Sequence, residues 1–264
     1  MNITQTIEKP PIGRIISKFS SGGTKTAERS LSPSRHQHRE ILIPLSGKQH
    51  YMLNERIFDF EPGCAGLVDR FVSHTPFYTQ NDQNLLQLWI LLYKDCVSSS
   101  LVKVYTGGKY DIVLHPRFPP EFGKIIEHRW DLLNLQENVT QEMVMEFMKQ
   151  PIELILDEFF LQLHHPSSTR NGEKLSDFLK HYIRANAGRN CSITELSKIS
   201  GYSASHLSHT FQKETGNTIR GFIDRVRLEY THAARNNGLK QKEIAYELGF
   251  SSPAAFWNWF RKHK

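Results

Sequence analysis

The pattern of apolar and polar residues along the chain changes its period near Pro119. Before that point, short apolar runs are separated by turn residues such as Ser46-Gly47 and Pro62-Gly63. Runs of this kind are typical of strands, and they predict strands over Ile12–Phe19, Glu40–Leu45, Gln49–Leu53, Ile57–Phe60, Cys64–Phe71, Leu85–Tyr93 and Ile112–Leu114. Many short strands at close spacing favour a β-barrel or a sandwich.

After Pro119 apolar residues recur every three or four positions, as on one face of a helix. This spacing predicts helices over Phe122–Glu137 and Thr140–Leu163, and Pro151 is expected to interrupt or kink the second helix. Such a helical hairpin can pack onto the strands, form a dimer face, or do both with different faces. The segment His164–Gly172 has the composition of a linker, so the predicted domains are residues 1–163 and 173–264, joined by a linker over 164–172.

The C-terminal domain contains one local pattern twice. In each copy a short apolar helix runs into a glycine next to an aromatic residue, then a serine, then a second helix with two apolar residues on one face. In the first copy Ser192 and Ser203 are predicted N-caps and Gly201 permits the turn. In the second copy Ser252 is the predicted N-cap and Pro253 takes the first helical position.

A long helix is predicted between the two copies, over Ile219–Asn236. The other helices expected here are Leu175–Ala187, a short one opened by Ser192, Ala204–Glu214, Gln241–Leu248 and Pro253–His263. The residues expected to face the cores are Ile193, Leu196, Ile199, Leu207, Phe211, Ile223, Val226 and Ala233. Two helix-turn-helix units joined rigidly in this way can enter successive major-groove segments about 34 Å apart.

Charge supports DNA as the partner of this domain. The whole chain carries a net charge of +6, but Arg170 to Lys264 alone hold 16 lysines and arginines against 8 acidic residues. The positive excess therefore lies with the repeated motif, as a phosphate-binding surface requires. A generic basic domain would show the same excess, so charge by itself does not decide between the two.

The residues from about Glu173 to Lys264 resemble the AraC/XylS family of bacterial transcription regulators. The resemblance is carried by Lys213-Glu-Thr-Gly216 with Arg225-x-Arg227-Leu, and by Ile244-Ala245-x-x-x-Gly249-Phe250-Ser251 with Phe256…Phe260-Arg261-Lys262. It implies a bipartite DNA-binding domain in which Ser205, Ser208 and His209 of one helix, and Ala254, Ala255, Trp257 and Asn258 of the other, lie at base-reading positions. The other reading of Trp257 is packing against Trp259 or the long helix.

The full set of candidate DNA contacts also includes helix caps and basic residues expected to reach phosphates. It comprises Ser203, Ser205, His206, Ser208, His209, Gln212, Arg220, Arg225, Arg227, Ser252, Ala255, Trp257, Asn258, Arg261 and Lys262. The first recognition helix is the more polar of the two. The second is therefore expected to bind mainly through phosphate contact and DNA shape.

The N-terminal domain resembles a cupin-like barrel, which precedes the DNA-binding domain in many AraC-type regulators and there binds an effector. His36-x-His38-x-Glu40, Gly47, Pro62-Gly63 and His74 carry this resemblance. The candidate effector-binding residues are His36, His38, Glu40, Tyr51, His74 and Trp89. Tyr51, Trp89 and Phe71 could stack on a sugar ring, although core aromatics are the commoner explanation. The histidines and Glu40 also form a reasonable ligand set for Fe, Mn or Zn. A polar wall of an effector pocket is nevertheless favoured, and no metal or cofactor is expected.

The predicted fold class is α+β: an N-terminal cupin-like β-barrel with a helical hairpin, followed by an all-α domain. The predicted function is a sequence-specific transcription regulator and not an enzyme. Its expected partners are double-stranded DNA, a small-molecule effector of the carbohydrate type, a second copy of the chain in a homodimer, and RNA polymerase. Three widely spaced cysteines and the lack of an apolar leader predict a cytoplasmic protein with no membrane partner. The alternatives are a cupin-type metal-dependent enzyme with an accessory DNA-binding domain, and a non-specific architectural DNA binder.

Overall fold

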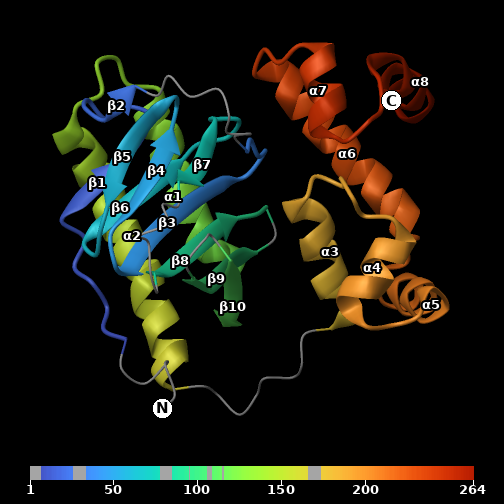
Figure 1. Cartoon of the computed structure of the whole chain (residues 1–264), viewed down its shortest axis with the longest axis horizontal. Coiled ribbons are helices and arrows are strands. Elements are labelled where there is room, and N and C mark those ends of the chain that lie inside the picture. Colours follow the sequence, from blue (N-terminus) through green and yellow to red (C-terminus); the bar gives the residue numbers. More distant parts are fainter. Residues whose placement is uncertain are drawn as a thin grey trace. The chain divides into compact units, whose positions relative to one another are not determined.

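The computed structural model describes residues 7–25, 34–77, 85–94, 96–105, 109–114, 116–165 and 174–264. The chain divides into two compact units, Met1–Ser167 and Ser168–Lys264, and each is described by itself (Figure 1). The first unit combines strands with two helices, and the described part of the second is helical. This confirms the predicted α+β class. Most of the predicted linker, residues 166–172, lies outside the described residues.

Two sheets make up the strand-rich part of the first unit (Figure 1). The larger sheet has the order β1-β6-β3-β8-β9-β10, with β11 also paired to β9, and the smaller has the order β2-β5-β4-β7. The strands are β1 (Arg14–Ile16), β2 (Thr24–Lys25), β3 (Arg39–Ser46), β4 (Gln49–Leu53), β5 (Arg56–Phe60), β6 (Cys64–Val68), β7 (His74–Phe77), β8 (Leu85–Leu92), β9 (Val97–Val104), β10 (Tyr110–Leu114) and β11 (Arg117–Phe118). The sequence prediction missed β2, β7, β9 and β11.

The strand β3 shows how the large sheet serves two cores. Ile41 and Ile43 belong to a cluster that also contains residues of the two helices. Leu42 points to the opposite face, where it joins Tyr51 and Phe60 of the smaller sheet. Successive side chains of a strand point to opposite faces, so Glu40 shares the face of Leu42. A polar group at this position therefore enters the space between the two sheets.

The helices α1 (Pro120–Asn134) and α2 (Gln141–His164) pack together and supply much of the core on the outer face of the large sheet. The helix α2 begins at the cap residue Thr140 and continues through Pro151, which is itself buried. The helix is therefore not interrupted at this proline, and the kink that the sequence offered as the alternative stays a prediction. A proline inside a helix removes one hydrogen bond and crowds the carbonyl four residues earlier, but burial of the α2 residues around it stabilises the helix on both sides.

The second unit contains α3 (Leu175–Ala185), α4 (Ile193–Ser200), α5 (Ala204–Thr215), α6 (Ile219–Asn236), α7 (Gln241–Glu247) and α8 (Pro253–His263). Leu196, Leu207 and Phe211 lie in its core, as predicted. Two inward placements are wrong: Ile199 is 40% exposed, and Ala234 is fully buried where Ala233 was expected. A one-residue error of this kind moves a side chain by about 100° around the helix.

Candidate functional site

The first helix-turn-helix unit, α4 and α5, presents a polar surface. Gly201 ends α4 in the left-handed conformation (φ 72°), and the Ser203 hydroxyl accepts a hydrogen bond from the His206 backbone N–H at the start of α5. Leu207 and Phe211 are buried and fix the inner face of α5. The candidate contacts on its other faces are all exposed, namely Ser205, His206, Ser208, His209 and Gln212.

Two of these side chains have partners in or next to the helix. The His206 ring stacks on Tyr202 with centroids 4.9 Å apart, and the Ser208 hydroxyl donates to the Ala204 carbonyl at 2.9 Å. The other three candidates on this helix, Ser205, His209 and Gln212, are also exposed.

The second unit, α7 and α8, is built in the same way. Gly249 has φ 76°, and the Ser252 hydroxyl accepts from the Ala255 N–H at 3.1 Å to begin α8. Phe256 and Phe260 are buried on its inner face. The outward positions carry Ala254, Trp257, Asn258, Arg261 and Lys262, whereas Ser252 and Ala255 are partly buried.

The two tryptophans of α8 have different environments. Trp257 is 43% exposed, with its ring 6.0 Å from that of Phe260. Trp259 packs toward the long helix, where its Nε1 donates to Asp224 Oδ1 at 2.9 Å. The inner packing position is therefore taken by Trp259, and Trp257 stays on the surface among the predicted DNA contacts.

The three arginines expected to contact phosphates are not equivalent. Arg220 and Arg225 are exposed, and Arg225 donates to Asn217 Oδ1 at 2.8 Å. Arg227 instead donates to the Gly188 carbonyl through Nε at 3.2 Å and Nη2 at 2.9 Å, and its guanidinium lies 5.2 Å from the centroid of Phe250. The expectation that Arg227 is free for phosphate is wrong, because its donors bind the α3–α4 loop at Gly188 and its guanidinium lies over Phe250 of the α7–α8 turn.

A cleft of about 720 Å³ lies between the two helix-turn-helix units. Ser208 and Gln212 of α5 line one side, Gly249 and Trp259 line the other, and Arg220 of α6 lies at its surface. The cleft therefore carries an exposed cation next to the polar face of α5. Such a surface suits a negatively charged backbone that passes from one unit to the next.

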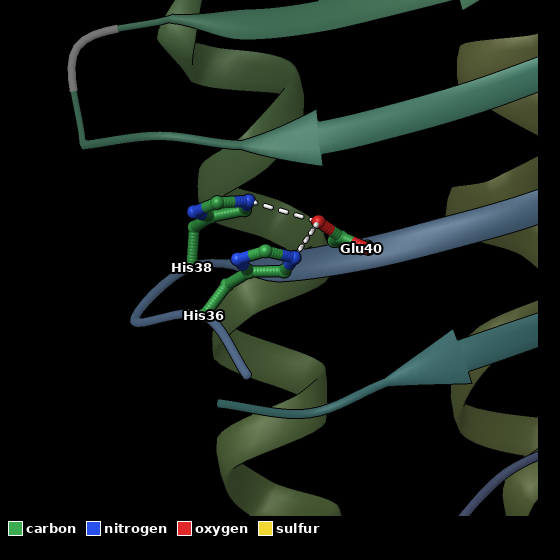
Figure 2. A group of neighbouring side chains, drawn as sticks. All are labelled: His36, His38 and Glu40. Carbon is green, nitrogen blue, oxygen red and sulfur yellow. Dashed lines mark hydrogen bonds and ion pairs between the residues drawn. The ribbon is translucent and has the colours of Figure 1, made fainter. Parts of the chain in front are cut away.

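The candidate effector residues of the N-terminal unit come together in space. His36 and His38 precede β3, Glu40 lies in β3, and His74 lies in β7 of the other sheet. The Nε2 atoms of His36 and His38 lie 3.5 and 3.0 Å from Glu40 Oε1 (Figure 2), and the Nε2 of His74 lies 3.4 Å from Glu40 Oε2. Three imidazoles thus surround one buried carboxylate.

Burial and neighbouring charge decide the ionisation of this cluster. Burial lowers the pKa of His36 to about 4, so its ring is neutral at pH 7. Burial also opposes ionisation of Glu40, but the surrounding imidazoles outweigh it and hold the pKa of Glu40 well below its ordinary value. A buried carboxylate among imidazoles of this kind can bind a cation or organise a polar ligand.

Aromatic side chains adjoin the cluster. The Tyr51 ring lies 6.3 Å from that of His74 and 6.0 Å from that of Trp89. The Trp89 Nε1 donates to Gln87 Oε1 at 3.0 Å, and the Gln87 amide donates to Gln49 Oε1. Sequence reasoning missed the two buried glutamines. Their signal was a single polar residue inside an apolar run at Gln87, and a polar residue at the start of a predicted strand at Gln49.

Comparison with known proteins identifies the C-terminal unit. Residues 196–264 match a family model described as a helix-turn-helix domain. The match spans α5 to α8 and most of α4, and therefore includes both candidate recognition helices. Among the described residues, no helix combines the length and the apolar character needed to cross a bilayer.

Two curated relatives are transcription regulators. The HTH-type transcriptional activator Btr of Bacillus subtilis (strain 168) is 33% identical over 106 residues, which is 39% of this chain but only 19% of that protein. The probable transcriptional regulator LumQ of Photobacterium leiognathi is 23% identical over 252 residues, which is 93% of each chain.

Solved structures of ToxT from Vibrio cholerae also match. An apo single-residue variant of ToxT is 12% identical over 88% of this chain and 87% of that chain, with a TM-score of 0.32. Wild-type ToxT with bound unsaturated fatty acid is 14% identical over 88% of this chain and 85% of that chain, with a TM-score of 0.31.

Proposed function

We propose that this chain, a transcription regulator of the AraC/XylS type, binds a specific operator sequence through α5 and α8. The observation that carries the proposal is the matched construction of the two units. Each holds a capped helix by a buried apolar pair and exposes the opposite face. The 18 residues of α6 connect them, a length of about 27 Å at 1.5 Å per residue. A spacing of this order suits two successive turns of the major groove.

In this proposal α5 carries most of the base reading. Its exposed Ser205, His209 and Gln212 can donate to and accept from base edges, whereas α8 offers only Asn258 for a bidentate contact with adenine. Arg261 and Lys262, in the last turn of α8, together with Arg220 and Arg225 of α6, are the proposed phosphate contacts. Phosphate contacts fix the register, and base contacts supply the sequence preference.

We further propose that a small-molecule effector, of the carbohydrate class, binds between the sheets of the N-terminal unit. Two buried polar atoms there, His38 Nδ1 and Gln49 Nε2, have no hydrogen-bond partner among the described residues. Buried donors and acceptors of this kind are usually satisfied by water or a ligand. The neighbouring rings of Tyr51 and Trp89 offer apolar faces on which a sugar ring can stack.

The regulator acts as a homodimer in this proposal, in the cytoplasm and without catalysis. Support for a second copy comes from the helix α2, where Leu154 and Leu161 are 45% and 57% exposed. They are seven residues apart and so lie on one face of the helix. RNA polymerase is the further partner that such a regulator would contact on a promoter.

Selection of binding sites from random DNA by the full chain tests the proposal. The expected outcome is one preferred motif with two parts, each about one helical turn from the other. His209→Ala is expected to weaken binding to the selected site by about 1–3 kcal/mol and to relax preference at one position. Lys198→Ala, an exposed change on α4 outside the proposed contacts, is the control. Equal binding to selected and random DNA would refute the proposal.

A further inference from the structure

We infer that Asp224 is a positioning residue, which fixes the orientation of α8 relative to α5 and so the one spacing of operator half-sites that the chain accepts. This inference rests on the proposed operator binding and deepens it, since it names a residue that sets the specificity of that site. Every group involved belongs to the C-terminal unit. The sequence predicted no role for Asp224, so the inference comes from its contacts.

Asp224 lies in the part of α6 that is built into the core beneath α5. Phe222 and Val226, two residues before and two after it, are buried. They share a cluster with Leu207 and Phe211 of α5. The Asp224 carboxylate is directed away from this cluster and contacts α8. The backbone of Asp224 is therefore fixed by the first helix-turn-helix unit, while its side chain binds the second.

Both carboxylate oxygens of Asp224 face α8. Oδ1 accepts a hydrogen bond from Trp259 Nε1 at 2.9 Å, and Oδ2 lies 3.5 Å from His263 Nε2. The His263 ring is held in turn, because its Nδ1 donates to the Trp259 carbonyl at 2.7 Å and the two rings stack with centroids 5.1 Å apart. The Asp224 side chain is only 17% exposed. A hydrogen bond to a charged and largely buried acceptor is stronger than one on the surface, so it can hold a helix in one direction.

A second attachment joins α8 to the other half of α6. The Phe260 ring lies 5.8 Å from that of His232, and the Arg235 guanidinium lies 5.8 Å from the Phe260 centroid. Asp224 and His232 are eight residues apart in α6, about 12 Å at 1.5 Å per residue. Two attachments at this distance fix the angle between α8 and α6, whereas the Phe260 contacts alone would let the second helix-turn-helix unit turn about them.

The neighbouring Arg227 does not duplicate this role. Its hydrogen bonds go to Gly188, and it touches the second helix-turn-helix unit through the face of the Phe250 ring. A contact between two flat groups limits their separation more than their direction. The bond between Asp224 and Trp259 is directional and acts on α8 itself.

The angle of α8 decides which base pairs the helix can reach. Each base pair added between two half-sites moves the second half-site by about 3.4 Å and turns it by about 34° around the DNA axis. A helix held at two places cannot follow this change, so its contacts with the bases are lost. A helix held only at Phe260 can follow it in part. The unchanged chain should therefore accept one spacing, and a chain without the Asp224 contact should accept several.

Binding of the full chain to operators of different spacing tests the inference. The selected operator is compared with versions that have one base pair added or removed between the half-sites. The unchanged chain is expected to lose at least about tenfold in affinity on the altered operators, because contacts to several base pairs are misplaced. Asp224→Ala, and Trp259→Phe, which keeps a ring but removes the donor, are expected to lose less than about threefold on the same operators. Each ratio is taken within one protein, so a general loss of stability or affinity cancels.

Three further variants serve as controls. Asp224→Asn keeps an oxygen that can accept from Trp259 Nε1, and it should keep the full loss of affinity on the altered operators. Glu229→Ala removes one negative charge from an exposed position of the same helix, and it should also keep the full loss. The double change of Asp224→Ala with Trp259→Phe should resemble either single change, because both remove the same bond.

A measurement without DNA keeps the test decisive. The indole N–H of Trp259, followed by NMR on the chain with isotope-labelled tryptophan, is expected to exchange with solvent more slowly than that of the exposed Trp257. Asp224→Ala should lose this protection. The inference is overturned if Asp224→Ala loses as much affinity on the altered operators as the unchanged chain, or if the Trp259 N–H exchanges equally fast in both proteins. An unchanged chain that prefers no operator would refute the operator proposal, and the exchange rates would then decide whether Asp224 holds α8.

Discussion

Arg227 provides the sharpest test of how the DNA-binding unit is built. Its guanidinium donates twice to the Gly188 carbonyl and lies over the Phe250 ring, so it joins the α3–α4 loop to the turn between α7 and α8. Arg225, two residues earlier, is exposed and donates to Asn217. The change Arg227→Ala should therefore reduce stability, and Arg225→Ala should reduce the electrostatic part of DNA binding.

The expected cost of Arg227→Ala follows from the contacts it removes. Hydrogen bonds from a charged donor contribute about 1.5–3 kcal/mol, and a partly exposed cation–π contact adds about 0.5–1 kcal/mol. The sum is about 2–4 kcal/mol, since both hydrogen bonds share one acceptor and are counted once. For a unit the size of Ser168–Lys264 this lowers the melting temperature by roughly 10 °C or more. Arg225→Ala should change stability by less than about 0.5 kcal/mol.

Two measurements on the full chain separate these roles. Hydrogen exchange resolved to individual peptides should show faster exchange in α3 and α6 of Arg227→Ala, with the N-terminal sheets unchanged. Binding to the selected operator is also measured over a range of salt concentrations. For folded Arg227→Ala, the slope of the logarithm of the binding constant against the logarithm of the salt concentration should be unchanged. The slope should fall by about one for Arg225→Ala. A stable Arg227→Ala protein with a reduced salt slope would show that Arg227 contacts phosphate, and the structural argument would be refuted.

The remaining predictions concern acid stability, the two turns and thiol reactivity. Burial opposes ionisation of Asp69, but Lys18 and Arg39 outweigh it and hold its pKa well below the ordinary value. Its contribution to stability is therefore complete above about pH 4 and is lost as the pH falls further. The melting temperature of Asp69→Asn should depend less on pH between 5 and 3 than that of the unchanged chain; equal dependence would contradict this. Gly201→Ala should lower the free energy of unfolding, measured with denaturant, by about 1–2 kcal/mol, because a residue with a Cβ is strained at the positive φ of this position. Gly249→Ala should cost more, because its Cβ would also meet a side-chain atom at 3.0 Å, and the reverse order would refute the turn geometry. Burial raises the pKa of Cys191 to about 12, so alkylation at pH 8 should modify the half-buried Cys96 first, as read by peptide mass spectrometry; faster labelling of Cys191 would show that its burial is wrong.

Local sequence determined much of the DNA-binding unit. The caps Ser192, Ser203 and Ser252 begin their helices as predicted, because each hydroxyl satisfies an N–H only three positions away. The apolar spacing of four also placed Leu207 and Phe211 in the core. In the first unit of the chain, strand alternation located β3 to β5 to within one residue at each end. These features depend on neighbours in sequence, and a single segment is sufficient to encode them.

Only the tertiary structure decided which distant groups meet. His74 reaches Glu40 because β7 and β3 belong to different sheets that face each other across a common core, and β7 itself was not predicted. Arg227 finds its acceptor at Gly188, 39 residues away, and so holds the fold together where sequence reasoning expected a phosphate contact. Periodicity specifies which face of an element a side chain occupies, but the partner on that face is set by how the elements pack. The sequence by itself thus determined two capped helices with a buried apolar pair each and an exposed opposite face, and packing determined which arginine is held by the protein and which histidines surround Glu40.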